Sequence, residues 1–433
     1  MTPSDYLPQL LFNPERIDEK ATTGLWFCLD PVDQAAIEDE AGNAVSLHLS
    51  GEWSDIDSCG PFFEAFRFIV IASPDKASRK TAVKQFRERF PVLPLVEIVS
   101  GYRDMLNMAG FARKYGATAL HDLLAYGKDV AARGILDLAD VERPPRTQSV
   151  LSGIWKLDRA IGGFAPGELT IWTGKRGEGK STIAGQILLQ ALDQGYNVFA
   201  YSGELPAWRF REWIYLQAAG PKNVRHATNQ ESMLQYTFVP PSIEHFLKEW
   251  TRGRFFLYDS AQPHANNPKD IFEVMDYAWR RNGCKVFMLD NLMSMELPSE
   301  EYYRAQSNLV GKAVEFAKRT QTHIHLVAHP RKTDGREFTA DDIGGSGDIT
   351  NRADNAMFIH RLDQEEREKN GFDVNLRVLK NRSYGEKVSI RLNYDKDSRR
   401  FYTIDKDPNW QYGWENPALW GPNGEWIGEQ PKE

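Results

Sequence analysis

The chain has 433 residues, of which 41% are hydrophobic and 26% are charged. This length is sufficient for two domains, and the composition is that of a globular protein. Three cysteines without a Cys-x-x-Cys pair exclude a four-ligand zinc ribbon and a disulfide framework. No stretch approaches the ~20 apolar residues of a membrane span. We therefore expect a cytoplasmic protein without a membrane partner.

The net charge of -7 is unevenly distributed along the chain. Residues 1–60 contain twelve acids and two bases, a charge of -10, so the remaining residues carry +3. An acidic block repels a phosphate backbone. Any nucleic acid is therefore expected to bind the C-terminal part of the chain.

The N-terminal third is predicted to contain a small α/β unit. Residues 1–60 are acidic and show no period, so we interpret them as irregular. A buried strand is predicted within 66–72, a basic helix over 78–90, a second strand over 94–99, and helical structure through 105–132. This order predicts a small β-α-β-α unit.

Residues 133–150 contain Pro144-Pro145 and are interpreted as a linker that can include a short helix over 135–141. From Leu151 onward, strands alternate with long helices, which predicts a mostly parallel sheet covered on both faces. The predicted strands are 169–173, 198–202, 255–258, 286–289, 324–328 and 356–361. Residues 387–392 and 400–404 are predicted to form a hairpin, followed by a tail without a period.

Residues 174–182 match the phosphate-loop pattern G-x-x-x-x-G-K-[ST], between a predicted strand and a predicted helix. Glycines allow backbone N–H groups to face an anion, and the following helix adds its partial positive charge. Lys180 is expected to reach the terminal phosphates and Ser181 to hold Mg²⁺. The predicted nucleotide-binding residues here are Gly174, Arg176, Gly177, Glu178, Gly179, Lys180, Ser181 and Thr182.

Three further polar residues follow buried strands and complete a phosphoryl-transfer site. Asp290 ends an apolar run and is expected to organise Mg²⁺, because ligands bind at the carboxyl edge of such sheets. Glu204 follows another strand and is a candidate general base; a solvated loop glutamate is an equal alternative. His329 is a candidate sensor of the terminal phosphate, although a lone histidine is more often structural.

Seven stretches, in order and without large gaps, resemble the motifs of superfamily-four replicative helicases, which are RecA-like hexamers. The resemblance is greatest to the branch of Twinkle and the phage primase-helicases, with DnaB more distant, and it covers about 151–405. The matching stretches are 152–158 with 162–169, the phosphate loop, 202–204, 289–292, 328–332, 344–355 and 379–382.

The resemblance implies an α/β, RecA-like ATPase that uses ATP or another nucleoside triphosphate with Mg²⁺. It implies that Lys380 and Arg382 reach the neighbouring subunit's site. Arg361 and Tyr394 match positions that sandwich the base, and ordinary packing is an equal alternative for Tyr394.

The resemblance also implies that residues 342–352 form a DNA-binding loop. This loop carries Asp348 and a single base, Arg352, which departs from the family, so upstream cations are expected to supply charge. The residues implied in DNA binding are Arg331, Lys332, Gly344, Gly345, Ser346, Gly347, Asn351 and Arg352.

Residues 66–132 resemble a Toprim domain, the catalytic fold of bacterial-type primases. An active Toprim domain has an Asp-x-Asp pair where this chain has Ser73-Pro-Asp75, and the segment 102–107 is similar to a later acidic motif. A single Asp does not hold two metal ions, so we expect no primase activity. An unrelated α/β accessory domain is the alternative.

The predicted organisation is therefore an acidic segment with a degenerate Toprim-like domain (1–132), a linker (133–150), an ATPase domain (151–405) and a tail with four tryptophans (406–433). The predicted function is an ATP-dependent helicase, hexameric like the family it resembles, that acts on single-stranded and forked DNA with replisome partners such as a polymerase. The expected location is a bacterial or phage-infected cell, with mitochondria less favoured. The alternatives are a recombinase-like or clock-type ATPase that does not unwind DNA, and an ATP-gated assembly factor.

Overall fold

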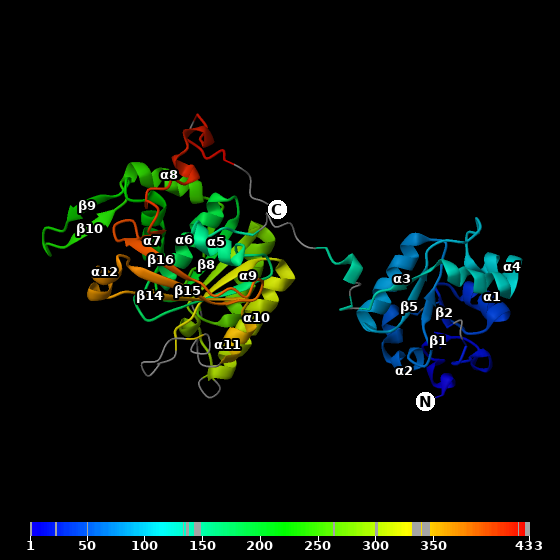
Figure 1. Cartoon of the computed structure of the whole chain (residues 1–433). Coiled ribbons are helices and arrows are strands. Elements are labelled where there is room, and N and C mark those ends of the chain that lie inside the picture. Colours follow the sequence, from blue (N-terminus) through cyan, green and yellow to red (C-terminus); the bar gives the residue numbers. More distant parts are fainter. Residues whose placement is uncertain are drawn as a thin grey trace. The chain divides into compact units, whose positions relative to one another are not determined.

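The chain divides into two compact units, Met1–Arg143 and Pro144–Glu433, both drawn in the computed structural model of Figure 1. No helix within the described ranges is long and apolar enough to cross a membrane. The structure describes residues 2–21, 24–49, 51–132, 134–135, 138–142, 149–262, 265–298, 302–330, 339, 347–422 and 424–428.

The N-terminal unit contains a six-stranded sheet in the order β1-β3-β2-β4-β5-β6. The central strands β3, β2, β4 and β5 are parallel, and the edge strands β1 and β6 are antiparallel to their neighbours. Its elements are β1 (Leu10–Leu11), β2 (Leu25–Cys28), α1 (Pro31–Ala41), β3 (Ala44–Leu47), α2 (Gly60–Phe63), β4 (Ile69–Ile71), α3 (Lys76–Arg89), β5 (Leu95–Ile98), α4 (Met108–Leu123) and β6 (Gly127–Val130).

Two predictions for this unit are wrong. Residues 1–60 are not irregular, because they form β2, α1 and β3 in the middle of the fold. The acids Asp39 and Glu40 lie on the exposed face of α1, while Ala36 and Ile37 pack inward. Because the apolar face of this helix is short and much of the rest is acidic, its sequence shows no clear helical period. The helical prediction through 132 also fails, since β6 pairs with β5 as an edge strand.

The C-terminal unit is built on a nine-stranded sheet in the order β11-β8-β12-β13-β7-β14-β15-β16-β17. The first six strands in this order are parallel to their neighbours, and the last three are antiparallel. Its strands are β7 (Leu169–Thr173), β8 (Asn197–Ser202), β9 (Arg225–Thr228), β10 (Gln235–Phe238), β11 (Phe255–Leu257), β12 (Cys284–Asp290), β13 (His323–Val327), β14 (Asn355–Arg361), β15 (Val374–Asn381), β16 (Ser389–Asp395) and β17 (Arg400–Thr403).

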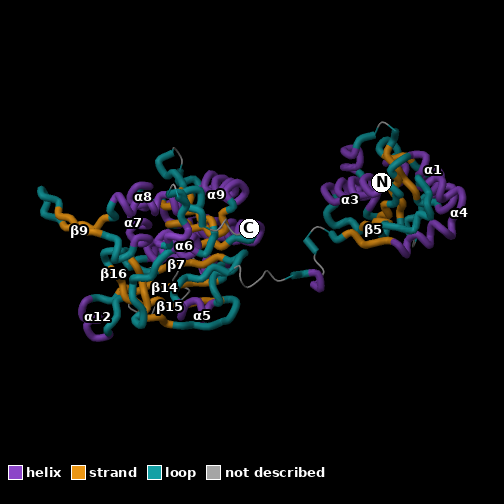
Figure 2. The backbone as a smooth tube through the Cα atoms, turned by 90° about the horizontal axis from the view of Figure 1, so that it is seen from above, coloured by secondary structure: helices purple, strands orange, loops and turns teal. Residues whose placement is uncertain are grey.

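Helices cover both faces of this sheet (Figure 2) because its central strands are apolar on both sides. In β12, Val286 and Met288 join one core layer with α6 to α8, whereas Phe287 and Leu289 join the other with α9 and α10. The helices are α5 (Trp155–Ile161), α6 (Lys180–Asp193), α7 (Ala207–Ala219), α8 (Pro241–Thr251), α9 (Pro268–Asn282), α10 (Tyr302–Thr320), α11 (Gly347–Arg352) and α12 (Gln364–Asn370).

The sequence-based prediction of a mostly parallel, two-faced sheet is confirmed, and all six predicted parallel strands are present. The antiparallel part is larger than expected, because β15 extends over eight residues before the predicted hairpin of β16 and β17. The two-stranded β9–β10 hairpin was not predicted; its strands are short and largely exposed, so they carry little apolar alternation.

The tryptophan-rich tail packs onto its own unit. The indole N–H of Trp414 donates to the carbonyl of Ala218 at the end of α7 (3.0 Å), and Trp420 packs edge-on against Phe246 of α8. Trp410 stacks on the buried guanidinium of Arg400 at 4.4 Å. These described tryptophans of the tail therefore pack on the surface of their own unit.

Candidate nucleotide-binding site

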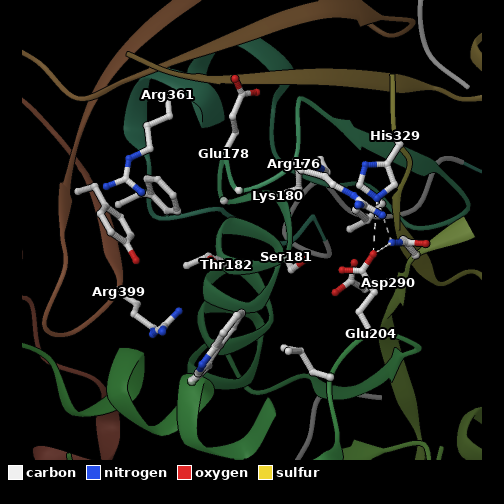
Figure 3. A pocket seen from close by; sticks show the side chains of 18 residues that line it. Arg176, Glu178, Lys180, Ser181, Thr182, Glu204, Asp290, His329, Arg361 and Arg399 are labelled. Carbon is white, nitrogen blue, oxygen red and sulfur yellow. Dashed lines mark hydrogen bonds and ion pairs between the residues drawn. The ribbon is translucent and has the colours of Figure 1, made fainter. Parts of the chain in front are cut away.

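The parallel strands bring the predicted polar residues to one edge of the sheet. Glu204 follows β8, Asp290 ends β12, His329 follows β13, and Arg361 ends β14. The carboxyl ends of parallel strands meet at the same edge, so these side chains surround the phosphate loop after β7 (Figure 3). The cavity there has a volume of about 250 Å³. It is lined by Arg176, Gly177, Glu178, Gly179, Lys180, Ser181, Thr182, Glu204, Leu205, Trp213, Asp290, Asn291, Val327, His329, Arg361, Tyr394, Arg399 and Phe401.

The phosphate loop requires glycine at two positions where the backbone runs close to other groups. Gly174 has a φ of 154°, and a Cβ atom there would lie 2.4 Å from the Ile359 carbonyl oxygen. Gly179 has a φ of 95°, and a Cβ atom there would lie 2.6 Å from the Phe401 ring. Lys180, the first residue of α6, donates from Nζ to the carbonyls of Gly174 and Lys175 at 2.8 Å each. Its ammonium is therefore held at the loop, and burial lowers its pKa.

Glu178 lies in the loop but uses both carboxylate oxygens on the protein. One accepts from the backbone N–H of Lys175 (2.7 Å), and the other lies 3.1 Å from Nδ1 of His360 on β14. The Glu178 hydrogen bond raises the pKa of His360. Glu178 therefore stabilises the conformation of the phosphate loop through these two contacts. Contact of its carboxylate with a nucleotide stays a prediction.

The surroundings of the Asp290 carboxylate fit a bound metal ion. Its side chain is 1% exposed, and Oδ1 has no hydrogen-bond partner in the described part of the protein. Burial raises the pKa of Asp290 to about 6, against a lowering contribution from the Ser181 hydroxyl. A buried carboxylate oxygen without a described partner, beside a hydroxyl and in the lining of the cavity, fits Mg²⁺, which takes one or two protein oxygens together with phosphate oxygens and water.

A short polar chain links the candidate base to the candidate sensor. The Nδ2 group of Asn291 donates to Oε1 of Glu204 and lies 3.2 Å from Nε2 of His329, while His329 Nε2 and Glu204 Oε1 are 3.6 Å apart. Asn291 is itself fixed, because its Oδ1 accepts from the backbone N–H groups of Met293 and Ser294. Asn291 is not among the residues predicted from the sequence, although it directly follows Asp290.

The opposite end of the cavity is aromatic and cationic. The guanidinium of Arg361 lies 5.1 Å from the Tyr394 ring centroid, so the structure brings together the two residues predicted to sandwich the base. Trp213 of α7 and Arg399 before β17 complete this end, with the Arg399 guanidinium 4.0 Å from the Trp213 ring centroid. Trp213 and Arg399 were not predicted from the sequence, and no linear motif marks them.

Lys380 and Arg382 lie away from this cavity. They stand at the end of β15, which is antiparallel to β14 and therefore finishes at the opposite edge of the sheet from Arg361. Lys380 Nζ donates to the carbonyls of Thr350 (2.8 Å), Asn351 (3.1 Å) and Ala353 (2.8 Å) at the end of α11. Arg382 is about half exposed and forms an ion pair with Asp354 at 2.9 Å.

The predicted DNA-binding loop is described only in part. Gly347, Asn351 and Arg352 belong to α11, and Arg352 donates from Nε to the Ser307 hydroxyl on α10 at 3.1 Å. The remaining predicted contacts lie outside the described residues; they are Arg331, Lys332, Gly344, Gly345 and Ser346.

In the N-terminal unit, the Toprim-like segments meet at the carboxyl edge of the sheet. The Tyr102 hydroxyl accepts from the backbone N–H of Ser73 (3.2 Å). Asp75 is the N-cap of α3 and accepts from the Ser78 N–H; hydrogen bonds from the Ser78 hydroxyl and from this N–H lower the pKa of Asp75. Asn107 is the N-cap of α4. Two polar side chains of the motif-like segments, Asp75 and Asn107, therefore serve as helix caps in this structure.

Comparison with known proteins places the C-terminal unit among helicases. The chain is 24% identical over 318 residues to the replicative DNA helicase DnaB of Mycoplasma genitalium, which covers 66% of this chain and 63% of that protein. It is 23% identical over 156 residues to the Twinkle homologue of chloroplasts and mitochondria in Arabidopsis thaliana, covering 34% of this chain and 22% of that protein. The chain therefore spans less than two thirds of these relatives.

Among solved structures, an ATPase domain superposes with a TM-score of 0.50 at 17% identity, covering 59% of this chain and 92% of that one, a likeness of fold alone. The Toprim resemblance and the Twinkle branch are not shown by these comparisons and stay predictions. The family description "DnaB-like helicase C terminal domain" matches residues 149–403, which is more than half of the sequence. The chain therefore belongs to the DnaB-like helicase C-terminal domain family.

Proposed function

We propose that this protein is a ring-forming, ATP-dependent replicative DNA helicase that translocates on single-stranded DNA and unwinds duplex. The observation that carries the proposal is the placement of Glu204 beside Asp290 and Lys180, held by Asn291 and facing His329. Positioned carboxylates and a buried ammonium around one end of a cavity suit phosphoryl transfer to water. Membership of the helicase family supports the same conclusion.

Each residue has a definite part in the proposed hydrolysis. Glu204 accepts a proton from the attacking water. Its carboxylate lines the cavity and is half exposed, so a water molecule can reach it. Lys180 leaves the loop carbonyls to neutralise the phosphate oxygens, and His329 contacts the terminal phosphate through a ring whose pKa burial keeps low. Ser181 and Asp290 would hold Mg²⁺, which would supply neutralisation of the negative charge on the phosphate groups.

The remote position of Lys380 and Arg382 supports a site shared between subunits. Both cations stand at the sheet edge opposite their own nucleotide cavity, so they serve a nucleotide only in a neighbouring copy. A finger supplied in trans makes hydrolysis depend on assembly. We propose a hexamer, with DNA passing near α11 and the segment before it, and with a polymerase or another replisome protein as a further partner.

The N-terminal unit is proposed to be a Toprim-like domain that has lost primase chemistry. A serine, Ser73, follows the parallel strand β4, and Asp75 is engaged as a helix cap. Two-metal catalysis needs clustered carboxylates, which this edge does not supply among the described residues. A role in assembly or in DNA capture is compatible with this arrangement.

The test is a forked DNA substrate with a fluorophore and quencher at the duplex end, incubated with the full chain, Mg²⁺ and ATP. Strand separation that requires hydrolysable ATP, together with hydrolysis stimulated by single-stranded DNA, is the expected result. Hydrolysis and DNA binding without strand separation would favour a recombinase-like or clock-type ATPase. Nucleotide binding without hydrolysis would indicate an assembly factor.

A further inference from the structure

The aromatic end of the nucleotide cavity contains two guanidinium groups and, among its described lining residues, no acidic counterpart. Arg361 and Arg399 both line the cavity, and neither has a carboxylate within ion-pairing distance in the described part of the chain. The carboxylate of Glu212 acts on Arg399 only from farther away. The other lining side chains at this end are those of Leu205, Trp213, Tyr394 and Phe401, so the described side chains here offer N–H donors, ring faces and one phenol hydroxyl, but no carboxylate or side-chain amide.

The backbone around Arg399 is fixed by two buried side chains. Arg399 has a φ of 58°, and Gln217 of α7 donates from Nε2 to the carbonyls of Arg399 (3.0 Å) and Thr182 (2.8 Å). Arg400 is 1% exposed and donates to the carbonyls of Gln217 (2.7 Å) and Ala218 (3.0 Å). The turn before β17 is therefore tied to α7 and, through Thr182, to the first turn of the phosphate-loop helix.

The Arg399 side chain is also oriented. Its guanidinium lies over the Trp213 ring at 4.0 Å, and Figure 3 shows it beside the cavity on the side away from Asp290 and His329. Stacking on a ring uses the flat face of a guanidinium and leaves its in-plane N–H groups available for hydrogen bonds. A planar pair of donors with fixed position is suited to a ligand edge that presents two acceptors.

We propose that Arg399, positioned by Trp213, recognises the edge of the nucleotide base and selects bases that carry a keto oxygen, guanine above all. Guanine presents O6 and N7 as adjacent acceptors to a guanidinium, and uracil or thymine presents O4. Adenine and cytosine present an amino donor in the same place, and the Arg399 guanidinium, which has only donors, cannot accept from it. This inference rests on the proposed function, because it names the substrate preference of the same site.

The experiment measures kcat/KM for GTP, UTP, ATP and CTP with the full chain, Mg²⁺ and single-stranded DNA. The wild type is expected to favour GTP over ATP by about tenfold, the lower part of the range for a bidentate contact to guanine. Arg399→Ala is expected to remove this preference, and Arg399→Lys to remove most of it, since lysine keeps the charge without the planar donor pair. Lys396→Ala is the matched control, because it removes an exposed cation from the same turn that does not line the cavity.

Binding of inorganic tripolyphosphate separates base recognition from the integrity of the phosphate end. All variants are expected to bind it within about twofold of the wild type, as the bidentate contact concerns the base alone. A GTP to ATP ratio that is unchanged in Arg399→Ala, or a wild type that prefers ATP or CTP, overturns the inference. If the wild type hydrolyses none of the four nucleotides, the proposed function fails. Equilibrium binding of GDP and ADP to the same variants then decides the base preference independently.

Discussion

Asp290 is expected to lower the stability of the nucleotide-free protein, and its replacement by Asn is expected to raise it. Burial raises the pKa of Asp290 from 3.8 to about 6. At 1.36 kcal/mol per pKa unit, this shift corresponds to a destabilisation of about 3 kcal/mol at neutral pH. Because Asn is nearly isosteric and uncharged, Asp290→Asn is expected to recover up to about this amount.

The pH dependence of the free energy of unfolding tests whether ionised Asp290 destabilises the folded state. The folded state binds a proton at Asp290 more readily than the unfolded state between pH 6 and 3.8, so the wild type recovers stability relative to Asp290→Asn as the pH falls through this window. Urea unfolding followed by tryptophan fluorescence at about pH 7.5 and about pH 4.5, above and within this window, measures the difference in the free energy of unfolding. Ten of the twelve tryptophans follow residue 149, so the signal reports mainly on the ATPase unit.

The same measurement with Mg²⁺ and a non-hydrolysable nucleotide tests the metal assignment. At a concentration about 100 times the dissociation constant, a ligand stabilises the wild type by about 2.7 kcal/mol. Asp290→Asn is expected to gain clearly less with Mg²⁺ and to respond equally in EDTA. A variant that is no more stable than the wild type at neutral pH refutes the desolvation argument. A variant that is more stable and gains the full ligand stabilisation refutes the role of Asp290 in holding Mg²⁺.

Three further predictions concern catalysis, assembly and acid stability. Glu204→Gln is expected to lower the ATP hydrolysis rate at least about 100-fold while ATP binding is kept, since the amide cannot accept the proton; unchanged turnover would remove Glu204 as the base. Arg382→Ala is expected to abolish hydrolysis but not binding, and mixing it with Lys180→Ala subunits should restore part of the activity; full activity of Arg382→Ala alone would contradict a finger in trans. Burial lowers the pKa of His323 from 6.5 to about 4, so between about pH 7.5 and about pH 5 the wild type should lose about 2 kcal/mol of stability that His323→Gln keeps; equal losses in urea titrations would disprove this.

The phosphate end of the cavity was predictable from the sequence because its parts are local. Residues 174–182 are contiguous, and Glu204 and Asp290 each follow an apolar strand whose end must lie at the carboxyl edge of a parallel sheet. Residues 1–60 show no comparable pattern of apolar residues in the sequence, because their strands are short and α1 buries only a narrow apolar face.

At the base end, Arg361 and Tyr394 were predicted through the family resemblance, but Trp213 and Arg399 were not predictable, because contacts between residues far apart in sequence bring them together. Trp213 and Arg399 meet only because Gln217 and Arg400 join α7 to the turn before β17, and these bonds run from side chains to carbonyl groups that no sequence pattern displays. The phosphate end of the cavity is therefore built by the parallel strands, whereas the base end combines Arg361 of β14 and Trp213 of α7 with Tyr394 and Arg399 of the antiparallel extension. Because Arg399 is tied to α7 through its backbone carbonyl, substitution of its side chain alone is expected to change which base is accepted without moving Asp290 or the phosphate loop.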